Sequence, residues 1–197
     1  MKNKKDNLYR IVAVALMAAL VYVGNYMQIK IPNGGLVTRI HLGNSMCLLA
    51  GLLFGGLSGG LSSGIGAAMY DLFDPVYITS APITFINKFA MGFTAGILRK
   101  KGKKWVIPAA VAGQAVYILL YLGKSFIGIL ITGEPVVVAL QMVSVNAVAS
   151  VINGVLAVII AVPLYSAIAA ALKHTGFGRL ISYDNETPED TQHIIPA

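Results

Sequence analysis

The chain has 197 residues, of which 56% are hydrophobic and only 12% are charged, and its mean hydropathy is +0.74. Soluble domains carry roughly 25% charged residues, so this composition excludes a soluble globular domain. The formal net charge of +7 does not indicate nucleic acid binding, because the basic residues flank long apolar runs. Those runs approach the ~20 residues that a helix needs to span a bilayer, which predicts an all-α integral membrane protein.

The apolar runs predict one membrane domain at residues 1–175 and a polar cytoplasmic tail at 176–197. The amino terminus has a basic start like that of a signal peptide. Its apolar stretch is long enough to span a membrane, and no clear cleavage site follows, so we expect an uncleaved first helix. The six predicted transmembrane helices lie at residues 8–29, 42–57, 59–73, 83–98, 105–131 and within 136–172.

The basic residues predict the orientation of these six helices. If the amino terminus is cytoplasmic, eleven of the fifteen Lys and Arg residues fall on the cytoplasmic side. Three fall outside and Lys88 lies within a span. This bias follows the positive-inside rule, so both termini are expected to be cytoplasmic.

The loop after the first helix, KIPNGGLVTRIH, is too polar to lie in lipid. Together with the start of the next span, it brings Arg39, His41 and Asn44 to the outer membrane face. The adjacent Gly34 and Gly35 would let the loop move as a lid over a binding site. A plain surface loop is the alternative.

The next two spans are short, and residues 51–66 contain seven glycines. Their spacing produces pairs of small residues four apart, which let membrane helices approach closely. Tight internal packing is one interpretation, and a sliding surface is the other. The single Cys47 excludes an intramolecular disulfide. The three histidines have no Cys or carboxylate partners at helical spacing, so neither a metal nor a cofactor is expected.

The fourth span carries Lys88 about five residues from its outer end, which corresponds to a depth of ~8 Å. Charged residues inside a membrane usually face a cavity and indicate a functional site. The neighbouring Asn87 adds to this polar outer half. Alternatively, Lys88 forms a structural ion pair with Asp71 or Asp74.

The fifth and sixth spans also carry polar residues in their outer halves. Gln114, Tyr117 and Tyr121 recur at helical spacing on one face, while Asn146 and Asn153 lie on the last span. Agreement in depth across three helices predicts a pocket open to the extracellular side. The tyrosines would otherwise form an interfacial aromatic belt, and the asparagines would otherwise join helices by hydrogen bonds.

Four segments resemble the S component of energy-coupling factor (ECF) transporters, the substrate-binding membrane subunit for vitamins in prokaryotes. They are ALMAAL, IHLGNSMCLLAGLLFGGLSGGLSSGIGAAMYDL, APITFINKFAMGFTAG and VNAVASVINGVLAVIIAVPLY, and they cover most of residues 10–172. The resemblance is greatest to the branch for riboflavin, pyridoxine, hydroxymethylpyrimidine and pantothenate. It implies a six-helix fold in the prokaryotic plasma membrane that binds its vitamin near the outer face.

The resemblance also implies roles for individual residues. Those expected to contact the vitamin are Arg39, His41, Asn44, Asn87, Lys88, Gln114, Tyr117, Tyr121, Asn146 and Asn153. Ala15 and Ala19 match the alanine motif that meets the transmembrane coupling subunit. The chain has no nucleotide-binding loop and is not expected to be an enzyme, so two separate ATPase subunits would supply the energy.

Two other functions stay open on the residues alone. One is a membrane scaffold without a ligand, and the other is a self-sufficient secondary transporter, although no convincing internal repeat is visible. The vitamin is also undecided. Two tyrosines favour a flat ring such as a flavin, pyridine or pyrimidine. Lys88 and Arg39 favour a carboxylate such as that of pantothenate.

Overall fold

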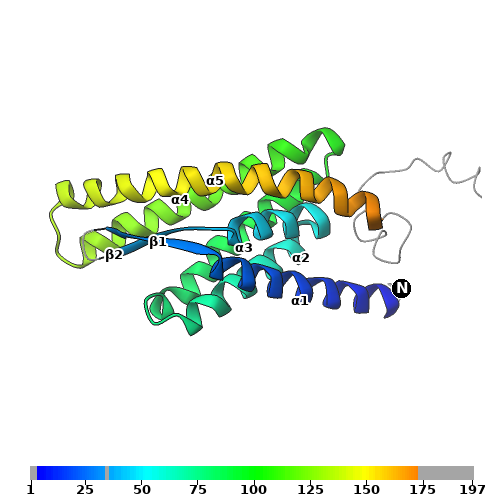
Figure 1. Ribbon diagram of the computed structural model, residues 1–197, viewed down its shortest axis with the longest axis horizontal. Helices are drawn as coiled ribbons and strands as arrows, with labels where there is room; N and C mark the ends of the chain where they lie inside the picture. The colour runs from blue at the N-terminus through cyan, green and yellow to red at the C-terminus, as the bar shows by residue number, and fades with distance from the viewer. Residues whose placement is uncertain (1–3, 34–35, 173–197) are drawn as a thin grey trace, which may run out of the picture.

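The structure, a computed structural model, describes residues 4–33 and 36–172 and is built mainly of helices (Figure 1). Five helices in this part of the chain are long and apolar enough to cross a membrane. They are α1 (Lys4–Tyr26), α2 (Gly43–Phe73), α3 (Ala81–Arg99), α4 (Val106–Ile131) and α5 (Val136–Leu172). Short 3-10 turns, η1 (Ile78–Ser80) and η2 (Lys103–Trp105), precede α3 and α4. The predicted polar tail at 176–197 lies outside the described residues.

The expected count of six helices is wrong, because the predicted spans 42–57 and 59–73 form the single element α2. Its backbone breaks at Gly55, where φ is 80° and ψ is −175°. A positive φ of this kind is accessible to glycine at little cost. No loop follows, because helical geometry resumes directly after this residue. Sequence reasoning therefore placed the division at residue 58, three residues after Gly55, and expected two separate helices where one element changes direction.

The chain reverses direction at Gly55. Ser63 Oγ donates a hydrogen bond to the carbonyl of Cys47 at 3.1 Å, although the two are 16 residues apart. A straight helix would separate them by about 24 Å. Gly59 lies against Gly51, since a Cβ built on Gly59 would be only 2.4 Å from the Gly51 Cα. Residues 43–54 and 56–73 are therefore two antiparallel arms of α2.

Glycines also bring α2 and α3 into backbone contact. A Cβ on Gly96 of α3 would lie 2.2 Å from the Gly55 carbonyl carbon, and one on Gly51 would lie 2.4 Å from the Gly92 oxygen. Side chains larger than hydrogen cannot occupy these positions without moving a backbone. The small-residue pattern in residues 51–66 thus serves close internal packing, as one of its two interpretations predicted.

The polar loop after α1 is an antiparallel β-hairpin, β1 (Gln28–Asn33) and β2 (Leu36–His41). Lys30 pairs with Arg39 in its register. The turn residues Gly34 and Gly35, on which the predicted lid motion rests, lie outside the described residues. The hairpin lies toward the end of the molecule opposite to the first turn of α1 and the last described turn of α5 (Figure 1).

Candidate ligand-binding site

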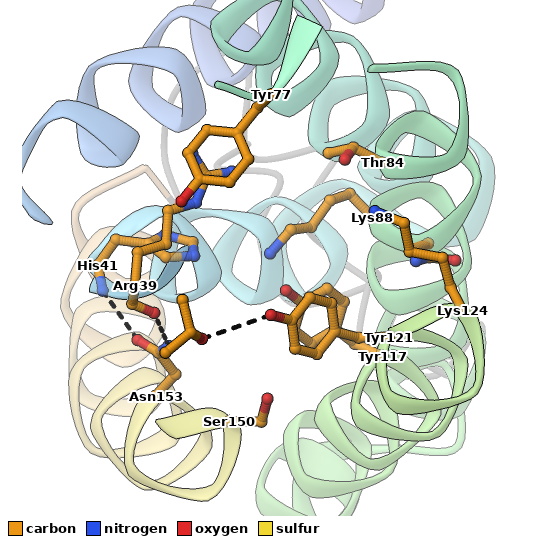
Figure 2. Close-up of a pocket in the computed structure, with 12 residues that line it drawn as sticks. Arg39, His41, Tyr77, Thr84, Lys88, Tyr117, Tyr121, Lys124, Ser150 and Asn153 are labelled. Carbon is orange, nitrogen blue, oxygen red and sulfur yellow. Dashed lines mark hydrogen bonds between the residues drawn. The ribbon is translucent and has the colours of Figure 1, made fainter. Parts of the chain in front are cut away.

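A small polar cavity lies between the hairpin and helices α3, α4 and α5. Its unfilled space is about 50 Å³, which is room for a few water molecules and less than a vitamin needs. Ligand binding therefore requires its side chains to move. The lining residues, most of them drawn as labelled sticks in Figure 2, are Thr38, Arg39, His41, Tyr77, Thr84, Asn87, Lys88, Tyr117, Tyr121, Lys124, Ser150 and Asn153.

Seven of the ten predicted contact residues lie on the wall of this one cavity. They come from four elements that are far apart in sequence. They are Arg39 and His41 on β2, Asn87 and Lys88 on α3, Tyr117 and Tyr121 on α4, and Asn153 on α5. The structure thus brings together the polar faces that the sequence placed at a common depth.

The other three predicted residues do not line the cavity. Asn44 lies behind Lys88 and accepts a hydrogen bond from its ammonium. Asn146 joins elements, accepting from Asn33 at 3.2 Å and donating to Ser125 Oγ at 2.8 Å. Gln114 lies in a separate apolar groove between α4 and α5, because its side chain projects toward Gly154. Helical spacing shows which face of a helix a residue lies on. It does not show whether a residue on that face contacts the cavity or a neighbouring helix.

Five lining residues were not among the predicted contacts. Thr84, Lys124 and Ser150 do belong to the polar faces of their helices, so their spacing was a usable signal. Thr38 and Tyr77 lie in the hairpin and in the connection before α3. No periodic pattern identifies such positions, because they reach the cavity only through the folding of the connections.

Lys88 is the most deeply buried cation of the cavity, with 2% of its surface exposed. Its ammonium donates to Asn44 Oδ1 and lies 3.8 Å from the centre of the Tyr117 ring. The alternative of an ion pair with Asp71 or Asp74 is wrong in the described part of the chain. Asp71 binds Arg39 at 2.8 Å, and Asp74 binds Lys30 at 2.9 Å.

Arg39 is held by its carboxylate partner and by two aromatic rings. Its guanidinium lies 4.2 Å from the centre of the Tyr77 ring and 4.9 Å from that of Tyr70. One of its terminal nitrogens, Nη1, is buried and has no hydrogen-bond partner. Burial raises the pKa of Tyr77 to about 12, against the opposing effect of Arg39, so its hydroxyl stays protonated. Arg39 thus lines the cavity with one terminal nitrogen that has no hydrogen-bond partner.

His41 is a neutral imidazole at the edge of the cavity. Burial, together with the positive charges of Lys88 and Arg39, holds the pKa of His41 well below its ordinary value. Its Nδ1 accepts a hydrogen bond from the Gly43 N–H at 3.1 Å. A neutral ring that accepts at Nδ1 carries its proton on Nε2. His41 thus provides an uncharged hydrogen-bond donor beside the two cations Lys88 and Arg39.

Tyr117 and Tyr121 stack on each other, with ring centres 5.8 Å apart and planes at 15°. Both line the cavity, and only 9% of Tyr117 is exposed. The alternative of an aromatic belt facing the lipid headgroups is therefore wrong. The two rings form a continuous apolar wall beside the polar groups of Lys88 and His41.

Asn153 ties the hairpin to α5. Its Oδ1 accepts from the His41 N–H at 2.8 Å, and its Nδ2 donates to the Arg39 carbonyl at 2.7 Å. Both bonds appear as dashed lines in Figure 2. Because the amide is occupied by the hairpin backbone, Asn153 positions β2 over the cavity, and this closes it from one side.

Comparison with known proteins identifies the chain. A family model described as "ECF-type riboflavin transporter, S component" matches residues 5–170. The chain belongs to this family. Its fold is similar to that of the S component of a bacterial ECF transporter, with a TM-score of 0.63 and 20% identity over 83% of this chain and 97% of the other. No curated protein matches the sequence.

A second solved structure has a similar fold. It is the S component for biotin from an ECF-type ABC transporter, with a TM-score of 0.60 and 20% identity. The similarity covers 92% of this chain and the whole of that one. The resemblance to ECF S components is thereby confirmed. Within this S component, the predicted interface residues Ala15 and Ala19 are both exposed on α1.

Proposed function

We propose that this S component binds a small water-soluble vitamin at the extracellular face and imports it as part of an ATP-driven ECF transporter. The observation that carries the proposal is the cavity itself. Polar groups from β2, α3, α4 and α5 converge on one unfilled space at the hairpin end of the molecule. A scaffold subunit without a ligand would have no need for a buried ammonium there, because burying a charge in a membrane is costly.

The arrangement of the helices supports an extracellular cavity. When the two antiparallel arms of α2 are counted separately, the long helices of residues 4–33 and 36–172 make six passes, so an up-and-down course returns the chain to its starting side. The first turn of α1 and the last described turn of α5 lie at the same end (Figure 1). The basic residues of the sequence favour a cytoplasmic position for that end. The hairpin and the cavity would then face outward.

The hairpin suits the role of a lid. It covers the cavity through two hydrogen bonds to Asn153 and through the Arg39–Asp71 ion pair. Since the unfilled space is too small for a vitamin, some of these contacts must break or lengthen when a ligand enters. Polar contacts of this kind are suited to reversible opening, because water replaces them when the lid lifts.

The proposed partners are a transmembrane coupling subunit and two ATPase subunits. Ala15 and Ala19 are exposed and one helical turn apart, so they offer a flat surface to a partner helix. The energy for import would come from the ATPases, because the chain carries no nucleotide-binding loop. The cell membrane of a prokaryote is the expected location.

The decisive test is ligand binding by the purified chain. Native mass spectrometry would look for a retained small molecule, and a thermal-shift screen would cover the B vitamins. We expect one vitamin to raise the unfolding midpoint in proportion to the logarithm of its concentration, because a ligand that binds only the folded state stabilises it. Uptake of that vitamin by cells should require co-expression of the coupling and ATPase subunits.

Other outcomes would contradict the proposal in distinguishable ways. Absence of any bound or stabilising vitamin would favour a scaffold. Uptake that proceeds at the same rate without the ATPase subunits would indicate a secondary transporter. Lys104 is exposed and lies in the basic run before α4. The Lys104→Met variant, which loses one positive charge outside the cavity, should bind the vitamin as the wild-type chain does.

A further inference from the structure

The charges on the cavity wall are unbalanced. Lys88, Lys124 and Arg39 all line it, and among the described residues no Asp or Glu does. Only Arg39 has a carboxylate partner, Asp71. Lys124 is partly exposed and donates to Ser80 Oγ at 3.0 Å, so solvent can screen its charge. Lys88 is shielded from solvent and forms no ion pair in the described part of the chain, although Asp71 attracts it from a distance.

The partners of Lys88 do not satisfy all the donors of its ammonium group. An ammonium group has three donors, and Asn44 Oδ1 takes one of them. The Tyr117 ring supplies only the partial negative charge of its face. Buried charges in proteins are normally paired, because an unpaired charge loses its hydration without compensation. Lys88 is therefore arranged to meet a negative group that the described chain does not contain.

Two further donors belong to residues that line the same cavity. Arg39 Nη1 is buried without a partner, and His41 has its proton on Nε2 because Nδ1 accepts from Gly43. Figure 2 shows the Lys88 ammonium directed toward the His41 ring, while the Arg39 side chain runs to the Tyr77 ring at the edge of the same cavity. A guanidinium nitrogen, an imidazole N–H and an ammonium are together suited to the two oxygens of a carboxylate.

The geometry points to a ligand that carries a carboxylate, which Lys88 binds at the centre of the cavity with Arg39 and His41 beside it. This inference rests on the proposed function and narrows its substrate class. The buried ammonium of Lys88 carries one positive charge that no ion pair neutralises. A carboxylate, with one negative charge, therefore matches it better than a doubly charged phosphate. Riboflavin, named in the family description, is a neutral molecule and would leave Lys88 unpaired. The stacked rings of Tyr117 and Tyr121 would then contact the apolar part of the acid.

Matched ligand pairs test the inference on the unmodified chain. The pairs are pantothenate and panthenol, biotin and biotinamide, and nicotinate and nicotinamide, with riboflavin and pyridoxine as neutral vitamins. Thermal shift and titration calorimetry on the purified protein would measure each. We expect one acid to bind and its neutral counterpart to bind about 30-fold or more weakly, since the loss of one partner of a buried charge pair has an effect of this size.

The Lys88→Met variant then tests which residue is responsible. It should bind the acid and its neutral counterpart almost equally, whereas Lys104→Met, at an exposed position outside the cavity, should retain the wild-type preference. If Lys88→Met does not fold, Lys88→Gln, which keeps a polar side chain, replaces it in the comparison. The ligand pairs give a result on the wild-type chain in either case.

Three results would overturn the inference. If riboflavin or pyridoxine binds more tightly than every acid, the carboxylate class is wrong while the vitamin-binding function stands. If the preference for the acid survives loss of Lys88, the assignment to this residue is wrong. If none of these acids binds, the inference fails, and the proposed function fails with it only if the wider screen of B vitamins also finds no ligand.

Discussion

The two halves of this molecule use their residues differently. Most of the apolar stretch of α2 is buried, and its glycines lie against α3 at backbone distance. Most of α5 is exposed, and its buried positions include the polar residues Asn146, Ser150 and Asn153. The first half is held together by close contact between small residues, and the second half is held to the hairpin by hydrogen bonds. Close packing suits a fixed framework, whereas hydrogen bonds would suit the lid that we propose.

The largest effect should come from the framework. In Gly96→Ala, the added Cβ would lie 2.2 Å from the Gly55 carbonyl carbon, so a backbone must move. We expect a loss of about 3 kcal/mol, or about 10 °C in the unfolding midpoint, measured by thermal unfolding in detergent. Gly123→Ala is the matched control, because nothing lies within 4 Å of its Cβ position. Equal midpoints for the two variants would contradict the role of α2–α3 contact.

The next effect concerns the two ion pairs of the hairpin. Asp71→Asn removes the negative charge beside Arg39 at a site where Asp71 is 1% exposed but keeps an acceptor oxygen, so we expect a loss of about 2 kcal/mol. Lys30→Gln is the control, because Lys30 has 43% of its side chain exposed and pairs with an exposed cation contribute less than about 1 kcal/mol, while Asp74 keeps its hydrogen bonds from Tyr70 and Val76. Unfolding midpoints of both variants would be compared. A larger loss in Lys30→Gln than in Asp71→Asn would show that burial does not determine the strength of these ion pairs.

A smaller effect is expected where the hairpin meets α5. Asn153→Ala removes two hydrogen bonds to the backbone of β2 and should speed ligand dissociation about tenfold, with the fold retained. Hydrogen exchange at the His41 N–H would report the loosened lid directly. Gln114→Leu is the control, since this buried amide has no hydrogen-bond partner on either terminal atom. A faster release in Gln114→Leu than in Asn153→Ala would contradict the lid assignment.

The smallest effect on the isolated chain should come from the exposed face of α1. Ala15→Leu together with Ala19→Leu should leave the unfolding midpoint and ligand affinity unchanged, because both side chains are exposed. Co-purification with the coupling subunit should be lost, since bulkier side chains prevent close helix approach. Ala115→Leu, an exposed alanine on α4, is the control. Retained assembly in the α1 variant would exclude this face as the interface.

Hydropathy and helical spacing predicted much of the site. They placed Lys88, Tyr117, Tyr121 and Asn153 at one depth on three helices, and these residues do share a cavity. The same reasoning also included Gln114 and Asn146, which face other neighbours. A helical period resolves a face of roughly 100°, which is wide enough to touch both a cavity and an adjoining helix. It carries no information about residues in connections, which is why Thr38 and Tyr77 were missed.

The sequence by itself determined the class of the protein, because hydropathy and the placement of basic residues act on each segment independently of its neighbours. Only the tertiary structure decided that α2 reverses at Gly55 and that Asp71 binds Arg39, 32 residues away, in preference to Lys88. Partner choice depends on which distant segments meet in space. No local pattern of residue types records that, so the unbalanced charge of Lys88 became visible only in the folded chain.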